Sequence, residues 1–206
     1  MGILNITPDS FSDGGFYNST ELAVKRASQL IIDGADILDI GGESTRPGAS
    51  QISIKEELNR IIPVIKEIRK RYKDILISVD TYKSEVAKQS IASGASIIND
   101  ISGLVLDKKM ASVAASLDVP VVLMHLKGTP QNMQVNPTYK NLISEIKDFL
   151  IKQANYAKKA GVKPKNIIID PGIGFGKTVK NNFEISAKLK EFANTGYPVL
   201  VGPSRK

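Results

Sequence analysis

Residues 167–177, IIIDPGIGFGK, decide how the rest of the chain is interpreted. The three consecutive β-branched apolar residues are typical of a parallel strand that is covered on both faces. The strand ends on Asp170, and the alternating glycines that follow permit positive φ or a close approach of the backbone. The stretch therefore predicts a buried strand with a carboxylate at its carboxyl end.

Two phosphate-binding motifs resemble this stretch, and neither fits it. A P-loop would place its first glycine at position 171, which is Pro171, and the dinucleotide-binding fingerprint would need glycine in place of Lys177. A glycine-rich turn after a strand is the simpler interpretation. We expect Lys177 to be solvated.

The composition is that of an ordinary globular protein. With 206 residues, 42% hydrophobic and 24% charged, the chain predicts a single domain over residues 1–206. It has no cysteine and a single histidine, His125, so thiolate and histidine-rich metal sites are excluded. Any divalent cation must take oxygen ligands, which favours Mg²⁺. We expect His125 to be a hydrogen-bonded core or rim residue and not a catalyst.

The net charge of +7 comes from lysines that are scattered over predicted helices, and only 6% of the residues are aromatic. This pattern argues against nucleic acid as a partner and suits a small anionic substrate. The chain has no apolar run of the roughly 20 residues that a membrane span needs, and its first residues do not follow the order of a signal peptide. We therefore expect a cytoplasmic protein without membrane contact.

Seven strands are predicted, each followed by a helix except the last. The strands are 2–7, 37–40, 75–79, 96–98, 119–124, 167–170 and 198–202. Three helices are predicted to begin near Asn18, near Ser53 (with Pro63 as a kink or as the true start) and at Leu142. Three more are predicted at 83–93, 110–117 and 183–192.

Strict strand–helix alternation implies an α/β fold with a parallel sheet. Nearly every strand ends on a polar residue or a glycine loop, which favours a TIM-type (β/α)8 barrel over an open sheet, since the barrel collects all strand ends at one rim. The chain would supply strands 1 to 7, with the last βα unit missing.

Polar residues at the predicted strand ends would meet at this rim. They are Asn5, Asp39, Asp80, Asn99, Asp100, His125, Asp170 and Lys206. Several buried acids need partners, so the rim indicates a ligand with many N–H donors, or a cation. For Asp36, Asp100 and Asp107 we expect only a capping role.

Seven segments, in order, resemble the motifs of the dihydropteroate synthase family: GILNITPDSFSDGG, GGESTRPGA, SVDTYKSEVA, IINDISG, VVLMHLKGTPQNMQ, IIIDPGIGFGKT and VGPSRK. The DSFSDGG and ESTRPG loops are distinctive of this family among pterin-binding barrels. The resemblance implies condensation of 6-hydroxymethyl-7,8-dihydropterin diphosphate with 4-aminobenzoate to dihydropteroate and diphosphate. It also implies sulfonamide inhibitors, Mg²⁺ as cofactor and a homodimer.

The resemblance also implies roles for individual residues. The pterin would be bound by Asp80, Asn99, Asp170 and Lys206, with Met124, Gly174 and Phe175 along its slot. Asn5 and Asp13 would lie at the magnesium ion and the diphosphate. Thr45 would contact the leaving group, and Arg46 and Pro47 would form the aminobenzoate site with Phe175. Asp13, Thr45, Arg46 and Lys206 would take part in catalysis.

The family pattern continues past Lys206 with a serine, a helix and an eighth strand. We therefore expect the domain to be incomplete at its C-terminus and poorly active alone. Two alternatives are a methyltetrahydrofolate-dependent corrinoid methyltransferase, against which the DSFSDGG and ESTRPG loops argue, and a non-catalytic pterin-binding protein, which stays open.

Overall fold

The computed structural model describes residues 1–7, 15–45 and 48–203, with the backbone alone for 15–19. The chain divides into two compact units. The first comprises Met1–Ser44 and Gln51–Asn99, and the second comprises Thr45–Ser50 and Asp100–Lys206. Within the described part of the chain, no helix is long and apolar enough to cross a membrane.

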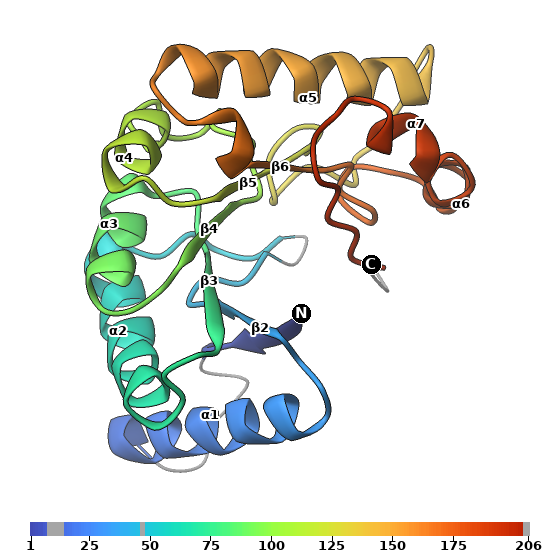
Figure 1. The fold of residues 1–206 in the computed structure, drawn as a ribbon. Helices are drawn as coiled ribbons and strands as arrows, with labels where there is room; N and C mark the ends of the chain where they lie inside the picture. Colours follow the sequence, from blue (N-terminus) through green and yellow to red (C-terminus); the bar gives the residue numbers. More distant parts are fainter. Residues whose placement is uncertain (8–14, 46–47, 204–206) are drawn as a thin grey trace. The chain divides into compact units, whose positions relative to one another are not determined.

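The first unit alternates strands and helices (Figure 1). They are β1 (Gly2–Asn5), α1 (Gly15–Ile32), β2 (Ile37–Gly41), α2 (Ile54–Arg71), β3 (Leu76–Asp80), α3 (Ser84–Ala92) and β4 (Ile97–Asp100). The four strands are parallel and pair in chain order. Helix α1 packs against β1 and α2, and α2 packs against α3. The carboxyl ends of all four strands therefore lie at one edge.

The second unit continues the alternation. Its elements are α4 (Met110–Leu117), β5 (Val121–Met124), α5 (Leu142–Lys159), the 3₁₀ turn η2 (Pro164–Asn166), β6 (Ile167–Asp170), α6 (Val179–Ala187) and α7 (Leu189–Ala193). Strands β5 and β6 are parallel, and α5 packs against both of them and against α4. The strand predicted from the opening stretch, 167–170, is confirmed.

The C-terminal elements differ from the sequence-based prediction. The strand predicted at 198–202 is reduced to one parallel bridge between Val199 and Ile169. Pro198 has no N–H to extend the ladder on that side. The helix predicted at 183–192 is two helices, because the backbone leaves helical geometry at Lys188 (φ −111°).

Helix α2 stays continuous through an internal proline. Pro63 lies inside a continuous helix, so its prediction as the true start was wrong. The capping signal was right, since the Ser53 hydroxyl accepts from the Glu56 backbone N–H at 3.2 Å. The apolar stripe of α2 is buried and includes Ile61, Ile65 and Ile68. Burial of this stripe offsets the backbone hydrogen bond that Pro63 cannot make.

Truncation of this stripe should destabilise the fold. Ile65→Ala removes a side chain with 0% exposure, and we expect a loss of about 2–4 kcal/mol in the free energy of unfolding. The matched control is Ile32→Ala, at a position that is 77% exposed, where the change should stay within about 0.5 kcal/mol. Urea titrations followed by circular dichroism measure both, and equal effects would contradict the assigned burial.

Candidate active site

Four strand ends of the first unit lie in one row. The parallel register pairs Asn5 with Gly41, Gly41 with Asp80, and Asp80 with Asn99. A Cβ built on Gly41 would lie 3.3 Å from Asp80 Oδ2 and 3.5 Å from Asn5 Oδ1. Two side-chain oxygens therefore border a position without a side chain, which makes the row a candidate site for a ligand that donates hydrogen bonds. The register confirms that three of the predicted site residues share one edge.

Asp39 fixes the orientation of Asn99. The Asn99 amide Nδ2 donates to both carboxylate oxygens of Asp39, at 3.3 and 3.2 Å, and both side chains are buried. Burial raises the pKa of the Asp39 carboxyl, and the Asn99 hydrogen bond opposes that shift. Because Nδ2 is used by Asp39, Oδ1 is the atom that Asn99 can present to a ligand.

The sequence placed Asp39 at the rim but gave it no role in the site. Asp39 precedes Gly41 by two residues on β2, so both lie on the same face of the strand. This spacing was the only signal for its role. The contact with Asn99 joins residues 60 positions apart, which only the folded chain brings together.

In the second unit, Asp170 ends β6 beside Met124 of β5, and both side chains are buried. Asp170 Oδ1 accepts from the Gly172 backbone N–H at 2.7 Å. The Asp170 carbonyl accepts from the His125 backbone N–H at 2.9 Å. The carboxylate predicted from the opening stretch is therefore held in place by its own loop.

The glycines after β6 allow direct packing of one backbone on another. Gly172 has φ +69°, and a Cβ there would lie 2.1 Å from the His125 carbonyl oxygen. Gly176 has φ +64°, and its Cβ would lie 2.8 Å from the Lys127 carbonyl oxygen. Side chains at either position would force the loop away from the segment that follows β5.

The prediction that Lys177 is solvated was wrong. Its side chain is 3% exposed. Lys177 Nζ lies 3.0 Å from His125 Nδ1 and donates to the carbonyl oxygens of His125, at 3.1 Å, and Phe175, at 2.8 Å. A lysine ammonium has three N–H groups, and here it has three acceptors. Lys177 thus ties the glycine loop to the segment after β5, although the sequence around it reads as an exposed turn.

Burial sets the ionisation of this pair. It lowers the pKa of His125 to about 3, and the neighbouring Lys177 charge acts in the same direction. It lowers the pKa of Lys177 to about 7, against the attraction of Asp170. His125 is therefore neutral and packs edge-on against Phe149, with ring centroids 5.0 Å apart. The prediction that His125 is a hydrogen-bonded core residue is confirmed.

The remaining predicted residues fall into three groups. Phe175 and Thr45 are half-buried. The backbone at Gly174 is held on both sides, since its N–H donates to Asn182 Oδ1 and its carbonyl accepts from Gln134 Nε2, both at 2.9 Å. Four predicted residues lie outside the described residues: Asp13, Arg46, Pro47 and Lys206.

Two of the aspartates expected to be helix N-caps have another role, since the N-cap of α4 is Lys109, without a side-chain cap hydrogen bond. Asp100 is fully buried and accepts from the backbone N–H groups of Ser102, at 2.8 Å, and Leu104, at 3.0 Å. Asp107 accepts from the Lys109 N–H at 2.9 Å. These carboxylates close turns and are not ligand groups of the site.

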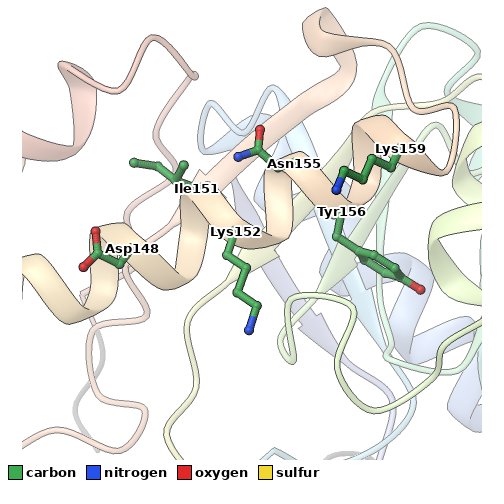
Figure 2. Close-up of a pocket in the computed structure, with 6 residues that line it drawn as sticks. All are labelled: Asp148, Ile151, Lys152, Asn155, Tyr156 and Lys159. Atoms are coloured by element: carbon green, nitrogen blue, oxygen red, sulfur yellow. The ribbon is translucent and has the colours of Figure 1, made fainter.

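A groove of 520 Å³ on α5 is a separate feature (Figure 2). Its lining residues all come from this one helix: Asp148, Ile151, Lys152, Asn155, Tyr156 and Lys159. Because it lies along a helix and includes none of the predicted site residues, we do not assign the site to it.

Comparison with known proteins decides the family. A model of the pterin binding enzyme family matches residues 1–206. The chain is 52% identical to the dihydropteroate synthase of Clostridium beijerinckii, over 100% of this chain and 74% of that protein. It belongs to the dihydropteroate synthase family.

Solved structures of dihydropteroate synthases agree with this assignment. The Xanthomonas albilineans enzyme with 4-aminobenzoic acid is 44% identical, with a TM-score of 0.92, over 100% of this chain and 72% of that one. The Yersinia pestis enzyme with a sulfonamide drug is also 44% identical, with a TM-score of 0.93, over 100% of this chain and 74% of that one. The predicted α/β barrel class is confirmed, and the family assignment favours the synthase over the corrinoid methyltransferase.

The Lys177 ammonium should make stability depend on pH. Its pKa is about 7 in the folded chain, against an ordinary value of 10.5, so between these values the unfolded chain binds more protons. The free energy of unfolding should then rise with pH. Between pH 7 and pH 9.5, the free energy of unfolding of the wild type should rise by up to about 3 kcal/mol relative to that of Lys177→Met. Urea titrations across this range measure it, and a difference independent of pH would contradict the lowered pKa.

Proposed function

We propose that this chain binds 6-hydroxymethyl-7,8-dihydropterin diphosphate and 4-aminobenzoate and condenses them to dihydropteroate. The observation that carries the proposal is the row of strand ends formed by Asn5, Gly41, Asp80 and Asn99. Relatives that bind 4-aminobenzoic acid and a sulfonamide drug support it. The alternative of a non-catalytic pterin-binding protein is an outcome of the test below.

The pterin would be recognised through its N–H groups. By the family resemblance, Asp80, the Asn99 Oδ1 and Asp170 would accept from the several N–H donors of the ring edge. Asp39 holds the Asn99 amide in the required orientation. We assign Met124, Gly174 and Phe175 to the walls of the slot and Lys206 to the ring carbonyl.

The reaction exchanges one bond for another at the pterin methylene. The C–O bond to diphosphate breaks, and the diphosphate leaves with the bonding electron pair. The pterin ring spreads the positive charge, the amine of 4-aminobenzoate forms the C–N bond, and the amine proton is lost to solvent. Thr45 would donate to the leaving diphosphate, and Arg46 and Pro47 would hold 4-aminobenzoate with Phe175. Exclusion of water prevents hydrolysis of the cation.

We propose Mg²⁺ as the cofactor, bound by Asn5 and Asp13. The donor set fits, because Asn5 is an exposed residue at the strand end, its side chain carries an amide oxygen, and Mg²⁺ takes oxygen ligands. No cluster of three histidine or acidic side chains that could hold a metal occurs in residues 1–7, 15–45 and 48–203, so water and the diphosphate would complete the shell. When bound, Mg²⁺ would neutralise part of the diphosphate charge.

The homodimer, the cytoplasmic location and the single-domain organisation stay predictions. They rest on the family resemblance and on composition.

Calorimetric titration tests the function. We expect the chain to bind pterin diphosphate in the presence of Mg²⁺ and then a sulfonamide. Asp170→Asn should weaken pterin binding by about 10–100-fold, because a hydrogen bond to a charged group is lost. The amide oxygen keeps the acceptor for the Gly172 N–H, so the loop should persist.

The matched control is Asp118→Asn, at an exposed carboxylate paired with Lys163, which should leave binding unchanged. Unchanged affinity in Asp170→Asn would overturn the pterin assignment. Binding of the pterin without any binding of the sulfonamide would favour the non-catalytic alternative.

A further inference from the structure

A half-buried charge cluster in the first unit has no role in the function proposed above. Lys83 Nζ contacts Glu43 Oε2 and Glu57 Oε2, each at 2.6 Å, and donates to the Ile52 carbonyl oxygen at 2.8 Å. The Tyr82 hydroxyl donates to Glu43 Oε1 at 2.7 Å. We name these five residues the Lys83 clamp.

Glu57 is the buried member of the clamp, and the other four residues are half-buried. The side chain of Glu57 is 1% exposed and that of Lys83 is 13% exposed. Burial raises the pKa of Glu57, and the Lys83 hydrogen bond opposes the shift. Buried ion pairs are poor sources of stability, because desolvation offsets the attraction. Here the three ammonium protons have three acceptors, which defines the position of each partner.

The clamp joins the two ends of one segment. Residues 44–51 lie between Glu43 and Ile52, and the Ile52 backbone N–H also donates to Glu43 Oε2 at 3.0 Å. Lys83 thus contacts the side chain at one end of the segment and the carbonyl at the other. These bonds hold Glu43 and Ile52, the residues that flank the segment, close to each other, which lowers the entropy cost of closing the loop between them.

Helix α2 contacts the backbone at Gly42, directly before Glu43. Arg60 Nη1 donates to the Gly42 carbonyl oxygen at 2.8 Å. A Cβ on Gly42 would lie 2.8 Å from Ile61 Cγ2, so the backbone rests directly on the helix. Glu57 belongs to α2 as well, and the clamp therefore links α2, the segment ends and the start of α3.

Lys83 is also close in sequence to the strand end that carries Asp80. The Thr81 N–H donates to the Asn99 carbonyl oxygen at 3.0 Å, and the Lys83 N–H donates to Thr81 Oγ1 at 3.2 Å. Residues 80–83 thus include both Asp80, a proposed pterin acceptor, and Lys83, which contacts both ends of the segment.

We propose that Lys83 is a positioning residue, which fixes the base of residues 44–51 and thereby places Thr45 against the leaving diphosphate. The proposal rests on the proposed function for the role of Thr45. It assigns Lys83 no contact with substrate, and its effect should therefore depend on whether the pterin carries a diphosphate.

The test compares two probes, 6-hydroxymethyl-7,8-dihydropterin and its diphosphate, by calorimetry with Mg²⁺ present. Lys83→Met keeps the length of the side chain and removes its three donors. We expect affinity for the diphosphate to fall about tenfold, with affinity for the alcohol unchanged within about twofold. Hydrogen exchange of the Ile52 amide, which donates to Glu43 Oε2, should become faster. A merely structural role would weaken both probes equally, and that result would overturn the proposal.

Two further variants keep the test decisive. Lys163→Met removes an exposed lysine that pairs with Asp118, and should change neither the affinity for either probe nor the exchange of the Ile52 amide. If Lys83→Met does not fold, Tyr82→Phe loosens the clamp while keeping the ion pairs, and should weaken the diphosphate alone by a smaller factor. Unchanged affinity and exchange in the folded variant would overturn the proposal. If wild type binds neither probe, the proposed function fails, and the exchange of the Ile52 amide still tests the clamp.

Discussion

Parallel pairing is the constraint on which the rest of the first unit depends. Because β1 to β4 run in the same direction, their carboxyl ends meet at one edge, and the register sets Asn5, Gly41, Asp80 and Asn99 in a single row. The missing side chain at Gly41 leaves space between two side-chain oxygens. Strand direction thus brings the polar side chains to one edge, and Gly41 leaves space between two of them.

Buried polar groups need hydrogen-bond partners, and the partners differ between the two units. In the first unit, the Asn99 amide and the Asp39 carboxylate satisfy each other, which leaves the amide oxygen as the atom to present to a ligand. In the second unit, the Asp170 carboxylate accepts from the backbone of its own loop. In each unit, a residue proposed to bind substrate is oriented before any ligand arrives, which reduces the entropy lost on binding.

The buried Lys177 and the half-buried Lys83 have similar structural roles. Lys177 spans the glycine loop and the segment after β5, and Lys83 closes the base of residues 44–51. Each has three acceptors for its three ammonium protons. Burial of a lysine is unfavourable unless every proton has a partner, so both contacts are specific in geometry. Both lysines lie beside segments to which we assign substrate contacts.

The sequence by itself determined the α/β alternation, the strand at 167–170, the capping of α2 by Ser53, and the family. The first three follow from local residue patterns, and the family follows from the order of the motifs along the chain. The tertiary structure alone decided that Lys177 is buried, that Asp39 orients Asn99, and that Lys83 joins Glu43 to Glu57. The physical reason is that burial and hydrogen-bond partners depend on residues that are distant in sequence. No local pattern around a charged residue specifies which distant acceptors will surround it after folding.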